Sequence, residues 1–100
     1  MLLEAIARIE PWQIDKVREY LSGALVGVRI DDFPRDNHVA HLFIVTEPSV
    51  PGGRPIRHYL LITRHFFERF ADQGSLRQAL ISAHVAKQLA RSGGRTVTLY

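Results

Sequence analysis

The sequence predicts an α+β fold: one small domain spanning residues 1–100, with a mostly antiparallel sheet of three or four strands and helices packed on one face. Three observations lead to this prediction. The composition, with 46% hydrophobic and 23% charged residues, is typical of a globular domain. Apolar residues recur with helical spacing both before and after three consecutive β-type segments. The connections between those segments are too short for parallel crossovers, so the expected order is α-β-β-β-α-α-β.

The first helix is expected to begin at Pro11, because proline suits the first turn of a helix. Its apolar residues recur at spacings of three and four: Ile14, Val17, Leu21 and Leu25. The helix should end near Gly23. Residues 1–9 fit a helical stripe only loosely, so both a helical turn and a short strand remain open for them.

Three strands are expected next, in the segments ALVGVRID, HVAHLFIVTE and IRHYLLIT. Prolines and glycines mark the connections DFPRDN and PSVPGGRP. In the first hairpin, one pairing produces a wholly apolar face made of Val26, Val28, Ile30, Ala40, Leu42 and Ile44. We expect that face to be the core, although a slip of one residue would exchange the two faces.

The third strand runs into two expected helices. Thr63 is suited to cap a short helix, RHFFERFAD, that stops before Gly74. Ser75 should cap a longer one that ends at Ser92-Gly93-Gly94 and carries the strongest apolar stripe in the chain: Leu76, Ala79, Leu80, Ala83, Ala86, Leu89 and Ala90. His84 would lie in the middle of that helix, at the border of the stripe. The final RTVTLY alternates as a short strand that would join the sheet edge or exchange with another chain.

The face opposite the expected core mixes apolar and polar residues. With the hairpin register given above, it carries the candidate interface residues Arg29, Val39, His41, Phe43 and Val45. An apolar patch with a polar rim is typical of an interaction surface. Either a partner covers this face or the N-terminal segment, with Trp12 and the Leu2/Leu3 pair, folds over it. The favoured interpretation is a small non-enzymatic interaction or regulatory module that forms a homodimer or binds a protein partner.

Nucleic-acid binding is the alternative, because the charge is uneven along the chain. Residues 1–53 hold five Arg/Lys and eight Asp/Glu, a net −3, whereas residues 54–100 hold eight and two, a net +6. The candidate phosphate-binding residues are Arg54, Arg57, Arg64, Arg69, Arg77, Lys87, Arg91 and Arg95. The contrary explanation is a solvated basic helix face balanced by the acidic half.

The order α-β-β-β-α resembles the core of double-stranded RNA-binding domains, but the residues do not follow that family. Its last helix begins lysine-rich and its strand loop is of Gly-Pro-x-His type, whereas this helix begins SLRQALISA and this loop reads DFPRDN. No RNA-contacting residue is therefore transferred, and no family is recognised.

Catalytic and metal-binding motifs are not visible in the sequence. It contains no G-x-S-x-G, G-x-G-x-x-G or G-K-[ST] motif and no cysteine, so no catalytic residue and no cofactor are predicted. The residues that could bind a metal are Asp31, Asp32, Asp36, His38, His41 and His58. His38 and His41 would leave opposite faces of a strand, and no His-x-His or His-x-x-x-His pair exists, so no metal site is expected.

The expected location is the cytoplasm. The N-terminal MLLEAIARIEPW contains Glu4 and Arg8 within an apolar segment too short for a signal sequence or a membrane span. No membrane association is therefore expected, and the lack of cysteine fits a reducing compartment.

Overall fold

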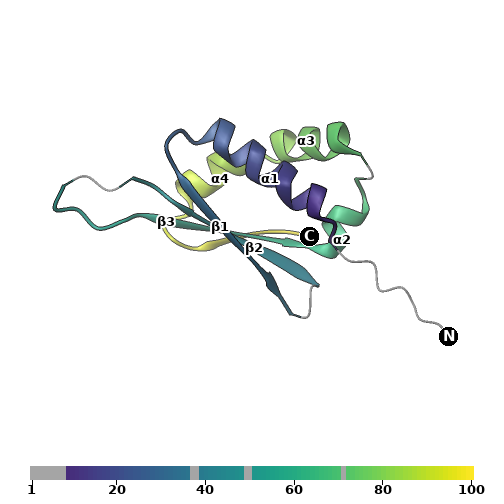
Figure 1. Ribbon diagram of the computed structural model, residues 1–100, viewed down its shortest axis with the longest axis horizontal. Coiled ribbons are helices and arrows are strands. Elements are labelled where there is room, and N and C mark those ends of the chain that lie inside the picture. The colour runs from purple at the N-terminus through teal and green to yellow at the C-terminus, as the bar shows by residue number, and fades with distance from the viewer. Residues whose placement is uncertain (1–8, 37–38, 49–50, 71) are drawn as a thin grey trace.

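The computed structural model describes residues 9–36, 39–48, 51–70 and 72–100. Its elements are α1 (Pro11–Ala24), β1 (Arg29–Arg35), β2 (Ala40–Thr46), β3 (Arg57–Thr63), α2 (Arg64–Glu68), α3 (Gln73–Ser82), α4 (Val85–Arg91) and β4 (Thr96–Leu99), shown in Figure 1. The sheet has the order β1-β2-β3-β4, with β1, β2 and β3 antiparallel and β4 parallel to β3. The predicted fold class and element order are confirmed, with the last predicted helix present as two, α3 and α4.

Helices α1, α3 and α4 lie together on one side of the sheet (Figure 1), and the core lies between the two layers. The sheet contributes Ile30, Phe43, Val45, Leu60, Ile62 and Leu99, and the helices contribute Val17, Leu21, Phe66, Phe67, Leu76, Leu80, Val85 and Leu89. We call the side of the sheet that faces these helices the covered face and the other side the open face.

The register of the first hairpin differs from the prediction by five residues, an odd number, because Arg35 and not Ile30 pairs with Ala40. Ile30 pairs with Val45 and Asp32 with Phe43, so Phe43 and Val45 face the helices. Leu42 and Ile44, which were expected in the core, therefore lie on the open face, and Val26 of the same expected face is 89% exposed, so the prediction was wrong for these three residues. Ile30 of that face is in the core as predicted. The cause is that β1 continues through Pro34 to Arg35, which pairs with Ala40 across a short turn. A slip of one residue moves every side chain of a strand to the other face.

Pro34 made the sequence look like a turn at this point, yet it lies within β1. Proline lacks the N–H that a central strand must donate on one side or the other, but an edge strand needs to be paired on one side only. β1 is an edge strand of the sheet, which makes this position compatible with proline.

β4 joins the sheet beside β3, which is one of the two possibilities predicted for the final segment. Between them the chain passes through α2, α3 and α4, a connection long enough to return to the same end of the sheet. β4 therefore runs parallel to β3, with Tyr59 opposite Thr96 and Leu61 opposite Thr98.

The predicted long helix is broken at His84, which has φ 52° and ψ 43° in the left-handed region. The apolar spacing gives the reason. Leu80 and Val85 are both fully buried but lie five residues apart, and a straight helix would not direct both to one side. The left-handed residue redirects the chain so that α4 buries Val85 and Leu89 while Ala90, part of the predicted stripe, is exposed.

Side chains accept hydrogen bonds from backbone amides at the N-terminal ends of α2, α3 and α4. Thr63 caps α2 as predicted, since its hydroxyl accepts a hydrogen bond from the Phe66 amide at 3.2 Å. The cap of α3 is Asp72, whose carboxylate accepts from the Ser75 amide at 2.8 Å, so the prediction of Ser75 as the cap was wrong. For α4, the Tyr20 hydroxyl of α1 accepts from the Ala86 amide at 3.2 Å.

Candidate interaction surface

The open face consists of four rows of side chains that run across the strands. The rows are Arg29, Thr46 and Arg57; then Asp31, Ile44, Tyr59 and Thr96; then Phe33, Leu42, Leu61 and Thr98; and last Arg35, Ala40 and Thr63. In the two middle rows, β2 and β3 carry apolar or aromatic side chains and β1 carries Phe33 in one row and Asp31 in the other, and polar or small residues surround the apolar ones. We call Phe33, Leu42, Ile44, Tyr59 and Leu61 the apolar band.

The apolar band is accessible to solvent. Phe33 is 49% exposed, and Leu42, Ile44, Tyr59 and Leu61 are each partly exposed. Helices α1, α3 and α4 lie on the other side of the sheet (Figure 1), and within residues 9–36, 39–48, 51–70 and 72–100 no helix packs over the band. A sheet face with contiguous uncovered apolar side chains and a polar rim is typical of a surface that a partner covers.

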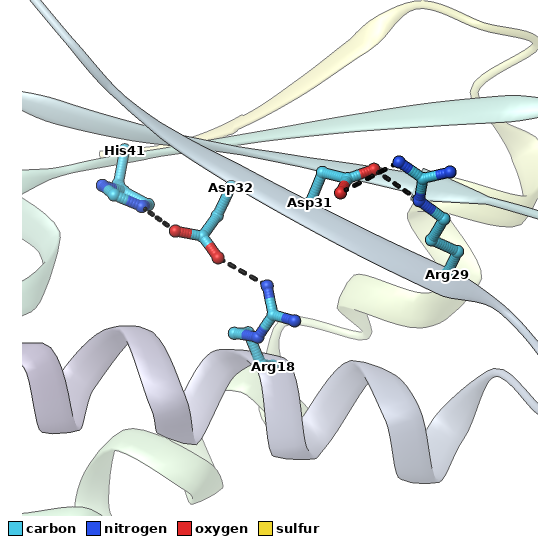
Figure 2. A network of polar contacts seen from close by, with 5 residues as sticks. All are labelled: Arg18, Arg29, Asp31, Asp32 and His41. Carbon is cyan, nitrogen blue, oxygen red and sulfur yellow. Dashed lines mark hydrogen bonds and ion pairs between the residues drawn. The ribbon is translucent and has the colours of Figure 1, made fainter.

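The rim of the band is basic. Arg29 and Arg57 belong to the row on one side, and Arg35 belongs to the row on the other. Arg29 forms an ion pair with Asp31 at 3.1 Å (Figure 2), whereas no ion pair between described residues involves Arg35 or Arg57. The strand residues of the open face therefore carry three positive charges and one negative charge, a net +2 from 3 − 1.

The structure separates the five predicted interface residues. Arg29 lies on the open face, and Val39 is 46% exposed in the turn between β1 and β2. His41, Phe43 and Val45 are on the covered face, where they are 6%, 0% and 0% exposed. These three side chains are therefore not part of the open face. Trp12 packs against the core from α1, and the Leu2/Leu3 pair that was expected to cover a sheet face lies outside the described residues.

A charged network lies on the covered face between α1 and the sheet. Figure 2 shows Asp32 directed toward both Arg18 of α1 and His41 of β2. Arg18 Nη1 lies 2.5 Å from one carboxylate oxygen and His41 Nε2 lies 2.8 Å from the other. Burial would raise the pKa of Asp32, but the hydrogen bonds and positive charges of His41 and Arg18 together lower the pKa below its ordinary value of 3.8.

His58 forms a second histidine–carboxylate pair, with its Nε2 2.5 Å from Glu47 Oε2. Both residues line a cavity of about 240 Å³ whose other walls are Ala24, Leu25, Val26, Val28 and Ala90. The His58 side chain is buried, and its Nδ1 has no hydrogen-bond partner among the described residues. The Glu47 side chain is half exposed, so the buried His58 is hydrogen-bonded to a carboxylate that reaches solvent.

Histidine–carboxylate pairs can transfer protons, which makes both pairs candidate catalytic groups. A nucleophilic mechanism would need a hydroxyl or thiol within hydrogen-bond distance of the histidine. Among the hydrogen bonds of the described residues, His41 and His58 bond only to Asp32 and Glu47. Each pair links neighbouring strands of the sheet, His41 of β2 to Asp32 of β1 and His58 of β3 to Glu47 just after β2, which is a structural role.

The eight predicted phosphate-binding residues are spread over the molecule. Arg57 lies on the open face, whereas Arg77, Lys87 and Arg91 lie on α3 and α4, on the other side of the sheet. Arg91 and Arg95 line one open cavity, at the turn between α4 and β4. Arg64 is partly buried at the start of α2, and Arg54 is exposed between β2 and β3.

Arg69 has contacts of its own. Its guanidinium lies 5.3 Å from the ring centre of Phe66 and 5.8 Å from that of Phe70, and it donates a hydrogen bond to the Tyr100 carbonyl oxygen. The eight basic residues therefore do not form one patch.

Sequence reasoning missed the apolar band because it assigned Leu42 and Ile44 to the core. The signal that could have found it is the polar pair Asp32 and His41 within the strands. When β1 is continued to Arg35, these two residues share the face with Phe43 and Val45, and Phe33, Leu42 and Ile44 come together on the other side. A charged pair at the edge of a core is tolerated when it is bonded, which single-sequence patterns do not reveal.

Within the described part of the chain, no group of three or more histidine, aspartate or glutamate side chains is arranged to hold a metal ion. None of the helices described is long and apolar enough to cross a membrane. Comparison of the chain with protein-family models, with curated proteins and with solved structures gave no match.

Proposed function

We propose that this chain is a non-enzymatic interaction module whose contact surface is the open face of its sheet, where it binds a protein partner or a second copy of itself. The observation that supports the proposal is the apolar band, whose five side chains are exposed or partly exposed while the helices pack on the other face. We further propose a cytoplasmic location, which agrees with the absence of cysteine from the sequence.

Two features of the band favour a protein partner over a nucleic acid. Three of its four side chains on the middle strands, Leu42, Ile44 and Leu61, are aliphatic, and aliphatic side chains do not provide stacking platforms for bases. The cationic residues lie at its rim, as is usual at protein–protein interfaces, where the centre is depleted of charge.

Site-specific photo-crosslinking tests the proposal even when the identity of the partner is unknown. A photo-reactive amino acid at position 42, within the band, should yield one discrete adduct in living cells. The same amino acid at Gln73, exposed at the start of α3, is the control and should not yield that adduct. Mass spectrometry of the adduct distinguishes a second copy from a different protein.

Ile44→Asp supplies the matched loss-of-function variant, because a carboxylate in the middle of the band should prevent apolar contact. Circular dichroism must show that the variant is folded. A crosslink from position 42 that survives Ile44→Asp, or equal adducts from positions 42 and 73, would refute the open face as the contact surface.

A further inference from the structure

The proposed function leaves the chemistry of the partner open, and the charges around the apolar band restrict it. We propose that the open face binds an acidic amphipathic helix, whose apolar stripe lies along the band and whose carboxylates flank the stripe on both sides. This inference rests on the proposed function, because it requires the open face to be a protein-binding surface.

The dimensions of the band fit one helix. Its two rows are two residues apart along the strands, about 7 Å. The band lies on β1, β2 and β3, and the whole four-stranded sheet is about 14 Å wide at about 4.8 Å spacing. A helix is about 10–12 Å in diameter with its side chains and rises 1.5 Å per residue, so roughly ten residues lie over the full width of the sheet. Apolar residues at positions i, i+3, i+4 and i+7 of such a helix would meet the two rows.

The arginines lie where carboxylates on the two sides of that helix would be. Arg57 is in the row about 7 Å to one side of the band, and Arg35 is in the row about 7 Å to the other. Both are exposed, and neither has an ion-pair partner among the described residues. Arg29 is neutralised by Asp31, and Asp36 follows Arg35 in the turn beyond the paired strands. Arg57 is thus the cation most available to a partner.

The same charges disfavour a second copy on this face. Two sheets that stack with their strands aligned and a two-fold axis between them would place the row of Arg29 and Arg57 either on itself or on the row of Arg35. Either arrangement brings two arginine-bearing rows together, and neither row supplies a carboxylate to pair with Arg57 or Arg35, so the contact lacks charge complementarity. A helix with aspartate or glutamate beside its apolar stripe meets the same rows with opposite charge.

Selection from a random library of displayed 14-residue peptides tests the inference, with Ile44→Asp used for counter-selection. The expected result is a set of peptides that bind the wild-type protein, fail to bind Ile44→Asp, and carry an excess of Asp and Glu beside an i, i+3, i+4, i+7 apolar pattern. A selected peptide should bind Arg57→Glu or Arg35→Glu at least about fivefold more weakly than wild type. Arg77→Glu, on α3, is the control and should leave the affinity unchanged.

Replacing the acidic residues of that peptide with lysine should reverse the preference, so that it binds Arg57→Glu more tightly than the wild type. Peptides that depend on Ile44 but show no acidic excess would overturn the inference and leave the proposed function intact. No Ile44-dependent peptide at all would overturn the acidic helix, and the crosslinking from position 42 then decides the proposed function separately. Arg57-dependent binding of labelled single-stranded RNA, without any selected peptide, would replace the acidic helix with a nucleic acid.

Discussion

At the residue scale, Asp32 and its two partners show how a charged side chain is accommodated at the edge of the core. Asp32 is about three-quarters buried, with its side chain 24% exposed, and each of its oxygens has a cationic or hydrogen-bonding partner. Arg18 comes from α1 and His41 from β2, so the carboxylate joins the helix layer to the sheet. A buried carboxylate without such partners would be strongly destabilising.

We predict that Asp32→Asn lowers the free energy of unfolding at pH 7 by about 1.5 kcal/mol, the lower end for hydrogen bonds to charged groups. Because the pKa of Asp32 is lowered in the folded protein, its contribution is present above pH 3.8 and is lost as the pH falls through the folded-state pKa. Urea unfolding between pH 7 and pH 2 should therefore show the two proteins converging below pH 3.8. Asp31→Asn, which affects an exposed pair, is the control. A constant difference down to pH 2 would contradict the assignment.

His84 is the second informative residue, because its left-handed conformation separates α3 from α4. We predict that His84→Gly raises the free energy of unfolding by about 0.5 kcal/mol, since relief of left-handed strain slightly exceeds the added freedom of the unfolded chain. His84→Val should lower it by at least about 1 kcal/mol, because a β-branched residue resists positive φ. Chemical denaturation of both variants provides the measurement, and equal effects of Gly and Val would indicate that residue 84 is helical.

At the element scale, α4 is oriented by which of its residues are buried. Val85 and Leu89 are fully buried, whereas Ala90 is exposed. The burial of these two residues, one turn apart, directs a single face of a short helix to the sheet. An unbroken helix from α3 would have turned the alanines inward instead.

We predict that Val85→Ala lowers the free energy of unfolding by about 1.5–3 kcal/mol, from lost burial and the cavity left behind. Ala90→Ser should change it by less than about 0.5 kcal/mol, as is usual for exposed positions. Thermal and urea unfolding of the two variants distinguish a helix broken at His84 from a continuous helix. A large cost at Ala90 together with a small cost at Val85 would support the continuous helix instead of the broken one.

At the scale of the whole molecule, the separation of charge along the chain does not become a separation in space. The eight basic residues of the second half are carried by the open face, the loops and the helices on the opposite side. A nucleic acid would have to wrap around the domain to meet all of them, and simultaneous phosphate contacts are what make such binding strong and salt-dependent.

We therefore predict weak binding to labelled single-stranded RNA, with a dissociation constant above about 10⁻⁴ M at physiological salt, the weak end of non-specific binding. Fluorescence anisotropy at about 50 mM and about 200 mM salt is the measurement. Sub-micromolar affinity that falls by a factor of about 10³ between these two concentrations would show that the basic residues act together.

The sequence by itself determined the fold class and several of the local elements. Pro11, the helical spacing of Val17 and Leu21, and the Thr63 cap predict elements that are present, because caps and periodic stripes act within one or two turns of chain. The alternating apolar segments likewise identified three strands, and their short connections identified the antiparallel hairpins.

Only the tertiary structure decided which face of the sheet meets the helices. Both faces of β2 are largely apolar, so its own pattern does not distinguish Phe43 and Val45 from Leu42 and Ile44. The choice depends on β1 extending past Pro34 and on the contacts of Asp32 with Arg18 of α1 and His41 of β2. These contacts join three different elements, α1, β1 and β2, and a change of one residue in register exchanges the core and the candidate surface.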